Sequence, residues 1–347
     1  LTTGGAPVAH AAGDTATIAG VGTLVIRADG GYSFTPAQDY DGPVPVVTYT
    51  ISDGVLADTG EVRLTITPVA DLVEITGLTD GGVPGTDGSV SESALAGGSG
   101  GGSVTHAGSF RISAPDGIAT LTVAGTVLTL AQLSAASAGA PVTITTGHGT
   151  LRITGYTDTS ATRPGTGEVH YEYTLTRAAD HTAGAVSEQI ALVLADQHGV
   201  SQAQTLAVSI ADDAPVAVAD SDEVINVPGN PSSEATGNVL TGVDVAAGAD
   251  ANDRDGAADV AGADGIVVSG VSAGAASSPL AGQVGQEVLG AYGKLMLNAD
   301  GSYRYVPDYT HPVVQALGPN QPLDDVFSYR ITDGDGDTDT ATLSIRI

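Results

Sequence analysis

The sequence GTLVIRADGGYSFTP at residues 22–36 returns as GKLMLNADGSYRYVP at residues 293–307, without a gap. Each copy precedes a second pair of similar segments, VTYTISDGVLADTGEVRLTIT ending at Thr67 and FSYRITDGDGDTDTATLSIRI ending at Ile347. The likeness therefore extends over a unit the size of a domain. Because an internal repeat sets the architecture of a chain, this pattern predicts one module used twice, with a different segment between the copies.

Local patterns indicate β-structure almost everywhere. Apolar and polar residues alternate in residues 61–67, 205–210 and 341–347, which gives a strand one buried and one exposed face. Asp-Gly pairs, which tolerate the positive φ angles of tight hairpin turns, stand between such stretches. Examples are residues 29–30, 53–54, 116–117, 300–301 and 333–334. Many short strands at this spacing predict an all-β chain of tandem Ig-like β-sandwiches, with cores of small aliphatic residues and tyrosine.

Two segments depart from this pattern. Residues 129–137 begin with a threonine that would cap about two turns of helix, although a loop fits this stretch equally well. The glycine- and serine-rich residues 97–103 have the composition of a flexible linker. Because the strand pattern that follows them needs partners on both sides, we expect a mobile surface loop there and no domain boundary.

Prolines mark the predicted boundaries. Pro68 follows the end of the first repeat, and Pro215 follows the acidic pair Asp212 and Asp213. A proline directly after a strand cannot continue the hydrogen-bond ladder. We therefore expect domains at residues 1–69, 70–214 and 215–347. We expect the first to be truncated at its start and the third to carry a long insertion at residues 226–288.

Charge restricts the possible partners. The 347 residues contain 11 basic and 40 acidic side chains, for a net charge of −29, and no cysteine. The negative charge therefore excludes a basic face that would bind nucleic acid or an anionic membrane. The lack of cysteine excludes disulfides and thiolate metal sites. No apolar run reaches the roughly 20 residues of a membrane span. Since the chain begins at Leu1 without Met and ends on a strand-like Ile347, we expect a segment of a longer protein.

Clustered carboxylates are the chemistry that the sequence offers. Their hard oxygens suit Ca²⁺, and the glycines between them let several oxygens approach one ion. The candidate ligands from spacing are Asp71 at the first boundary, Asp212, Asp213, Asp220 and Asp222 around the second, and Asp333, Asp335, Asp337 and Asp339 in the last turn. A further cluster at residues 250–256 lacks the bidentate glutamate of an EF-hand loop. The alternative is that these acids are solvated loop residues.

Longer motifs resemble known repeats. VSESALAGGSGGGS, FRISAPDGIATLTVAG and YEYTLTRAADHTAGAVSEQIALVLADQHGV, within residues 71–214, resemble a repeat of giant type I-secreted RTX adhesins of Gram-negative bacteria. ADGSYRYVPD, FSYRITDGDGDTDTATLSI and GNVLTGVD resemble the VCBS or bacterial cadherin-like repeats of those proteins. The resemblance implies Glu92 as a further calcium ligand. It does not extend to the family's DxDGD turn, because residues 195–199 read ADQHG.

The resemblance implies a function. It predicts a secreted, calcium-stiffened extender region of cadherin-like domains at the bacterial cell surface, forming an extended rod that supports adhesion and biofilm formation. Its partners would be neighbouring repeats of the same long chain, and we expect a monomer, with host or surface ligands bound by other regions. The alternative is an adhesion module that binds a glycan or protein through residues 226–288, although this stretch lacks aromatic residues for glycan stacking.

Enzymatic motifs are missing from the sequence. The seven histidines form no HExxH motif, no GxSxG elbow occurs, and the glycine-rich stretches lack the lysine and following helix of a phosphate loop. Paired carboxylates for glycoside hydrolysis remain conceivable in any acidic β-protein, but every acidic cluster here already falls at a turn or linker. We therefore expect a non-enzymatic chain.

Overall fold

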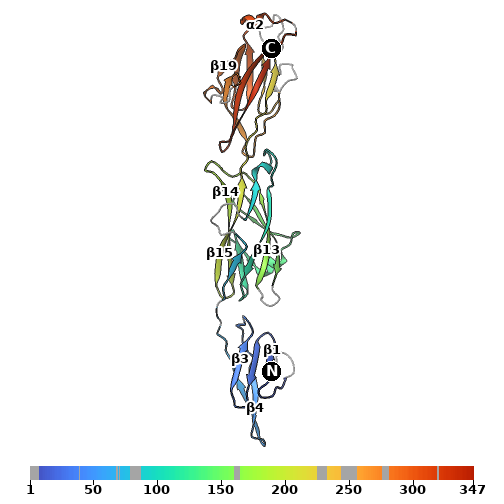
Figure 1. Cartoon of the computed structure of the whole chain (residues 1–347), viewed down its shortest axis with the longest axis vertical. Coiled ribbons are helices and arrows are strands. Elements are labelled where there is room, and N and C mark those ends of the chain that lie inside the picture. Colours follow the sequence, from blue (N-terminus) through green and yellow to red (C-terminus); the bar gives the residue numbers. More distant parts are fainter. Residues whose placement is uncertain are drawn as a thin grey trace.

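The computed structural model describes residues 8–347 except 39, 68, 70, 79–86, 160–164, 225–232, 244–255, 276–280 and 319. The described part is nearly all strand and forms three lobes that follow one another along the longest axis (Figure 1). The chain begins in the lobe at one end and finishes in the lobe at the other. The all-β prediction of tandem β-sandwich domains is confirmed.

The middle lobe is a sandwich of two five-stranded sheets. One has the order β10-β9-β14-β15-β7, from Thr126–Thr129, Ile118–Val123, Val186–Asp196, Ser201–Ala211 and Gly88–Ser91. The other has the order β11-β12-β13-β8-β6, from Val142–Thr145, Gly149–Asp158, Thr166–Leu175, Thr105–Ser113 and Glu74–Thr76. Alternate residues of β13 are buried, as the two-residue period of a strand requires. Their side chains join one hydrophobic core between the sheets, in which Leu121, Leu151 and Tyr173 are fully enclosed.

The third lobe is a smaller sandwich of two four-stranded sheets. One has the order β16-β23-β22-β18, from Asp220–Glu223, Thr338–Arg346, Asp324–Asp333 and Ile266–Ala273. The other has the order β17-β21-β20-β19, from Ala235–Asn238, Ser302–Pro307, Gly293–Leu297 and Glu287–Leu289. Its core is separate from that of the middle lobe and contains the buried Tyr305, Phe327 and Tyr329. The expected reliance on tyrosine is therefore confirmed here.

The first lobe contains the other copy of the repeat, with fewer strands among its described residues. Its sheets have the orders β1-β2-β3, from Thr15–Ile18, Gly22–Ile26 and Tyr32–Pro36, and β4-β5, from Val47–Ser52 and Ala57–Val62. Strands β2 and β3 match β20 and β21 in sequence and in pairing, since Leu24 lies opposite Phe34 as Leu295 lies opposite Tyr305. The repeat thus specifies the same hairpins at both ends of the chain.

Helices are few and short. The described residues contain two α-helices, α1 (Leu130–Ala135) and α2 (Pro312–Gln315), and two 3₁₀ turns, η1 (Glu92–Ala94) and η2 (Ala281–Gln283). Thr129 begins α1 with a capping box, in which its side chain accepts from the backbone N–H of Gln132 and the Gln132 side chain accepts from the N–H of Thr129. The helical alternative for residues 129–137 is therefore correct. Among the described residues, none of the helices has the length and apolarity needed to span a membrane.

Candidate metal centre

Acidic side chains from two lobes meet where the middle lobe adjoins the third. Ligand atoms of Asp212, Asp264 and Asp335 lie within 4.8 Å of one another, and so do ligand atoms of Glu92, His181 and Asp212. Asp212 belongs to both groups, so the five residues form one cluster, which we call the junction cluster. Glu92, His181 and Asp212 belong to the middle lobe, whereas Asp264 and Asp335 belong to the third. A cation bound here would touch both.

Local structure fixes the two ends of this cluster. Glu92 opens the 3₁₀ turn after β7, and its Oε1 accepts a hydrogen bond of 2.6 Å from the backbone N–H of Ala179. Asp335 lies in the turn between β22 and β23, where Asp333 Oδ1 accepts from the N–H groups of Gly336 and Asp337 at 2.9 and 2.7 Å. Gly336 has a φ of 111°, which glycine adopts without strain. The Asp-Gly repeats therefore curl the turn so that Asp335 faces the other lobe.

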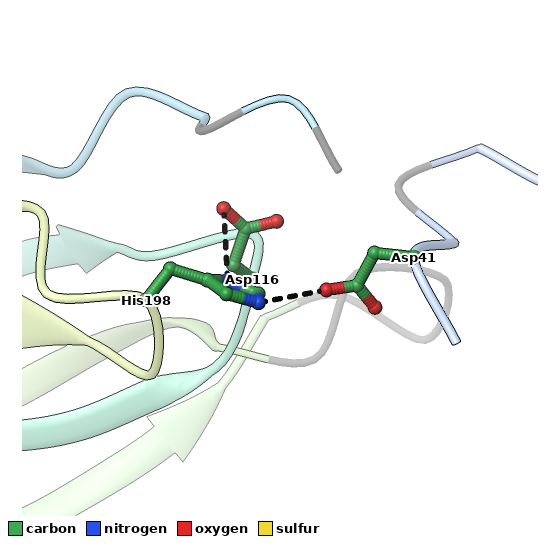
Figure 2. A group of neighbouring side chains, drawn as sticks. All are labelled: Asp41, Asp116 and His198. Carbon is green, nitrogen blue, oxygen red and sulfur yellow. Dashed lines mark ion pairs between the residues drawn. The ribbon is translucent and has the colours of Figure 1, made fainter. Parts of the chain in front are cut away.

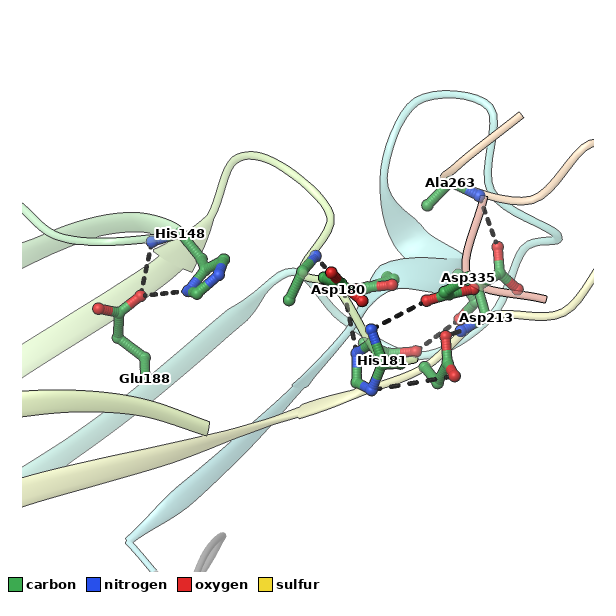
Figure 3. Close-up of polar contacts among 12 residues, drawn as sticks. His148, Asp180, His181, Glu188, Asp213, Ala263 and Asp335 are labelled. Atoms are coloured by element: carbon green, nitrogen blue, oxygen red, sulfur yellow. Dashed lines mark hydrogen bonds and ion pairs between the residues drawn. The ribbon is translucent and has the colours of Figure 1, made fainter. Parts of the chain in front are cut away.

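A hydrogen bond joins the lobes at this point. Asp335 Oδ2 accepts from the backbone N–H of His181 at 3.1 Å, as Figure 3 shows. His181 Nε2 lies 3.3 Å from Glu92 Oε1, and its Nδ1 lies 3.9 Å from Asp212 Oδ2. His181 is thus enclosed by carboxylates of the junction cluster.

Several polar atoms of the junction cluster are buried without a hydrogen-bond partner among the described residues. They are Glu92 Oε2, His181 Nε2 and Asp335 Oδ1. Glu92 is completely buried. Since a buried carboxylate oxygen without a partner is costly, these atoms mark a place where a ligand would supply the missing interaction.

Glu188, another buried glutamate of the middle lobe, differs from Glu92 in its hydrogen bonds. Glu188 accepts from the backbone N–H groups of Gly147 and His148 at 2.9 and 2.6 Å and from the Tyr173 hydroxyl at 3.2 Å, and the His148 contact is drawn in Figure 3. Both of its oxygens are therefore satisfied by protein groups. Glu92 has one satisfied and one free oxygen, which is the arrangement expected of a metal ligand held in place by the protein.

The electrostatics of the junction cluster favour a cation. Burial raises the pKa of Glu92 and of Asp212. Burial, and then the negative charges of Asp335 and Glu92, raise the pKa of Asp264 to about 6. No arginine or lysine in the described ranges forms an ion pair with these carboxylates, so His181 is the only basic side chain described among them. A divalent ion with oxygen ligands would relieve this repulsion.

Asp213 has a different role beside this cluster. Its Oδ2 accepts from the N–H groups of Ser99 and Ala263 at 2.9 and 3.2 Å, and its Oδ1 accepts from the Ser99 hydroxyl and the N–H of Ala214 (Figure 3). The carboxylate is therefore saturated by protein donors from both lobes. The glycine-rich loop predicted to be a mobile surface segment supplies two of these donors, and it thereby forms part of the junction.

Asp220 and Asp222 lie in the third lobe, outside the junction cluster. Asp222 accepts from the Tyr303 hydroxyl at 2.6 Å. Asp220 accepts from the Tyr329 hydroxyl at 2.8 Å, and the same hydroxyl lies 3.1 Å from Asp259 Oδ1. These buried carboxylates are therefore partners of core tyrosines. They attach the first strand of the sandwich to its centre.

The Asp220–Tyr329–Asp259 contact predicts a pH effect. Burial raises the pKa of Asp220 to about 7 and that of Asp259 to about 6, well above the value of about 4 in an unfolded chain. The folded state therefore binds protons more tightly, and its stabilisation by protonation is complete below about pH 4 and lost as pH rises to 7. We expect Asp220→Asn to make the free energy of unfolding of the third lobe depend less on pH between pH 5 and 8. Chemical denaturation across that range, with Asp324→Asn as surface control, would measure it, and parallel curves for all three proteins would contradict it.

The remaining predicted ligands are distributed around the junction turn. Asp333 stabilises the turn itself, Asp337 is exposed, and Asp339 Oδ2 accepts from the N–H of Ala217 at 2.8 Å. Of the predicted residues, the structure therefore brings Glu92, Asp212 and Asp335 into the junction cluster. The acidic residues 250–255 of the EF-like stretch lie outside the described residues.

A second group lies where the first lobe adjoins the middle one. His198 Nε2 is 3.0 Å from Asp41 Oδ2, and His198 Nδ1 is 3.6 Å from Asp116 Oδ2, as Figure 2 shows. The predicted ligand Asp71 contributes its backbone, since its N–H donates to Asp116 Oδ2 at 3.1 Å. The imidazole of His198 therefore fills the space between the carboxylates of the two lobes.

Sequence reasoning missed several residues of these two groups. Asp264 and His181 of the junction cluster follow ordinary loop sequences, and Asp41, Asp116 and His198 are far apart in the chain. The available signal was positional, because Asp41, Asp116 and Asp264 each precede a glycine and His198 belongs to the turn that departs from the DxDGD pattern. Spacing alone does not show which turns meet.

Comparison with known proteins identifies the two end segments. Residues 212–347 match the family model of the bacterial cadherin-like domain, and residues 8–67 match that of the cadherin-like domain. No curated protein is significantly similar to the chain in sequence.

Solved structures that align with the chain include mouse clustered PcdhgC3 EC1-3, at 13% identity and a TM-score of 0.29, covering 93% of this chain and 84% of that one. Another is Protocadherin Gamma C5 EC1-3, at 11% identity and a TM-score of 0.28, covering 88% and 78%. Scores at this level carry no argument about function. The family models are the specific finding: the chain carries cadherin-like domains at residues 8–67 and 212–347.

Proposed function

We propose that the chain is a calcium-binding structural segment of a bacterial cell-surface adhesin, in which an ion at the junction cluster stiffens the connection between two domains. The observation that carries this proposal is the set of buried, unpartnered atoms on Glu92 and Asp335, which come from different lobes and each belong to a ligand group that includes Asp212. Cadherin-like families at both ends support an extracellular, adhesion-type repeat segment.

The finer parts of the proposal rest on the sequence. The motifs of residues 71–214 support an RTX adhesin exported by type I secretion, with VCBS-type repeats on either side and a role in biofilm formation. The separate hydrophobic cores support domains bounded near residues 69 and 214. We propose a monomeric, non-enzymatic segment whose main partners are neighbouring repeats. The described part of residues 226–288 supplies β17, β18 and Asp264 to the fold and the cluster, which favours a structural role over glycan binding.

Direct calcium titration tests this proposal. We expect isothermal calorimetry of the metal-free chain to show calcium binding with a dissociation constant of about 0.1–1 mM, as in other extracellular modules. Glu92→Gln and Asp335→Asn should each weaken binding at least about tenfold, because each removes an anionic ligand. Glu61→Gln is the matched control, since Glu61 is an exposed surface acid paired with Arg63. Unchanged isotherms for both cluster variants would contradict the proposed site.

A further inference from the structure

His181 brings a nitrogen ligand into a cluster that otherwise consists of carboxylates. Its side chain is 5% exposed, and its Nε2 is among the buried atoms without a hydrogen-bond partner in the described part of the chain. Calcium takes oxygen ligands, so a calcium ion would leave this nitrogen unsatisfied. Imidazole nitrogen is instead a ligand of zinc and related transition metals. The junction cluster therefore contains one buried atom that a calcium site does not explain.

The spacing around this nitrogen matches that of a tetrahedral metal site. His181 Nε2 lies 3.3 Å from Glu92 Oε1. Zinc binds histidine nitrogen and carboxylate oxygen at about 2.0–2.2 Å, and two such ligands at the tetrahedral angle are about 3.4 Å apart. The two buried atoms are therefore already spaced as neighbouring ligands of one ion.

An ion pair between the two side chains explains their contact less well. Nε2 needs an acceptor if it carries a proton, and a donor or a metal ion if it does not. Despite the short distance to Glu92 Oε1, Nε2 makes no hydrogen bond, and Glu92 Oε2 is without a partner as well. Each of the two neighbouring side chains thus has a buried ligand atom to satisfy, and one metal ion would satisfy both.

Asp212 supplies the third ligand. Its Oδ1 accepts from the backbone N–H of Asp213 at 2.8 Å, and its Oδ2 lies 3.9 Å from His181 Nδ1. The Asp212 side chain is 36% exposed, so it can move toward an ion and leaves a further coordination position open to water. His181 and its surroundings are drawn in Figure 3.

The protein orients these ligands from outside the site, as it does in metal centres generally. The backbone N–H groups of Ala179 and Asp213 hold the carboxylates of Glu92 and Asp212. The backbone N–H of His181 donates to Asp335 Oδ2 of the third lobe at 3.1 Å. An ion on the His181 ring would therefore be connected to both lobes.

We propose that Glu92, His181 and Asp212 bind a transition-metal ion of the zinc class, with His181 Nε2 as its nitrogen ligand. This inference rests on the proposed function in taking the junction cluster as a metal site, and it adds a second class of metal to that site. Zinc and calcium would compete for the carboxylates of Glu92 and Asp212. The imidazole of His181 would contribute to the binding of zinc alone.

Zinc and calcium titrations of the intact, metal-free chain test the inference by calorimetry. We expect His181→Gln to lower the ratio of zinc to calcium affinity at least about tenfold, because the loss of a residue that merely orients a ligand already costs about 10–100-fold. Calcium binding by this variant would also show that it is folded.

Two other histidines provide the controls. His148 lies 3.1 Å from Glu188, whose oxygens protein donors satisfy, so His148→Gln should leave zinc binding unchanged. His198→Gln reports any zinc held by the His198 group, where the first lobe adjoins the middle one. Zinc binding that His181→Gln leaves unchanged, or that only His198→Gln weakens, would overturn the inference.

Nuclear magnetic resonance of the parent chain with isotope-labelled histidine gives a readout that does not require a variant to fold. We expect zinc to shift Nε2 of His181 as a bound ligand and to leave the ring of His148 unaffected, and the absence of a His181 shift would overturn the inference. Zinc on His181 in a chain that binds no calcium would support this inference and contradict the calcium role alone. Calcium binding without zinc on His181 would do the reverse.

Discussion

Calcium at about 10 mM, a hundredfold excess over a dissociation constant of about 0.1 mM, is expected to raise the melting temperature of the middle and third lobes by about 10 °C. An ion at a hundredfold excess over its dissociation constant stabilises the folded state by about 2.7 kcal/mol, and each kilocalorie shifts the midpoint of a domain of this size by about 4 °C. Sodium chloride at equal ionic strength should raise the melting temperature much less. Screening weakens the repulsion between carboxylates but provides no divalent ion for the free oxygens of Glu92 and Asp335 to coordinate.

Calcium should reverse the order of the melting temperatures of the parent protein and the Glu92→Gln variant. Burial raises the pKa of the Glu92 carboxyl, which means that its negative charge is unfavourable in the folded protein. Glu92→Gln removes this charge, so without calcium we expect the variant to melt at or above the temperature of the parent. With calcium the parent should be the more stable protein, because the amide is a weaker ligand. Differential scanning fluorimetry in EGTA and in calcium, with Glu61→Gln as control, would show the crossing. A parent midpoint that is the same in EGTA and calcium would rule out the role of calcium.

Removal of the acids at the second junction is expected to make the chain bend there. Asp212 belongs to both parts of the junction cluster, and Asp213 holds Ser99 of the middle lobe and Ala263 of the third. Asp212→Ala with Asp213→Ala would therefore break the hydrogen-bonded and the metal-linked connection together, while both hydrophobic cores remain intact. Small-angle scattering in calcium should show a smaller maximum dimension or a broader ensemble than the extended shape in Figure 1.

A control pair separates this effect from the loss of charge. Asp53→Ala with Asp58→Ala removes two acids from the hairpin β4-β5, far from the junction along the chain, and should leave the scattering profile unchanged. Identical scattering for the parent and the Asp212/Asp213 variant would mean that the junction is held by other packing. Unfolding of either lobe in the variant would show as a lost thermal transition, so the two outcomes are distinguishable.

The fold class was predictable because its signals are local. Alternating residues and Asp-Gly pairs specify strands and turns over a few residues each, and the repeat shows that one arrangement of hairpins occurs twice. Three of the ten predicted ligands, Glu92, Asp212 and Asp335, meet in the junction cluster. The contexts of Asp212 and Asp335 mark linker and turn positions, where strands end and acids can face a neighbouring domain, whereas Glu92 was implied by the resemblance.

The other predicted acids show where that reasoning stops. Asp213, next to Asp212 in the sequence, is saturated by backbone and hydroxyl donors, and Asp220 and Asp222 are buried against tyrosines. All three are aspartates close to Pro215, so the local sequence does not distinguish their roles. Tertiary contacts separate them, because Asp213 meets donors from Ser99 and Ala263, whereas Asp220 and Asp222 face the core tyrosines of the third lobe.

The sequence by itself determined the all-β class, the repeated hairpins and the excess of negative charge, since each follows from residues close together in the chain or from composition. Only the tertiary structure decided which acids share a site. Asp264 and His181 join Glu92 because folding brings a loop ahead of β18 and a loop between β13 and β14 against the turn after β7. Likewise, similar motifs leave Ile51 exposed and Ile331 buried, because burial depends on strands contributed by distant segments of the chain.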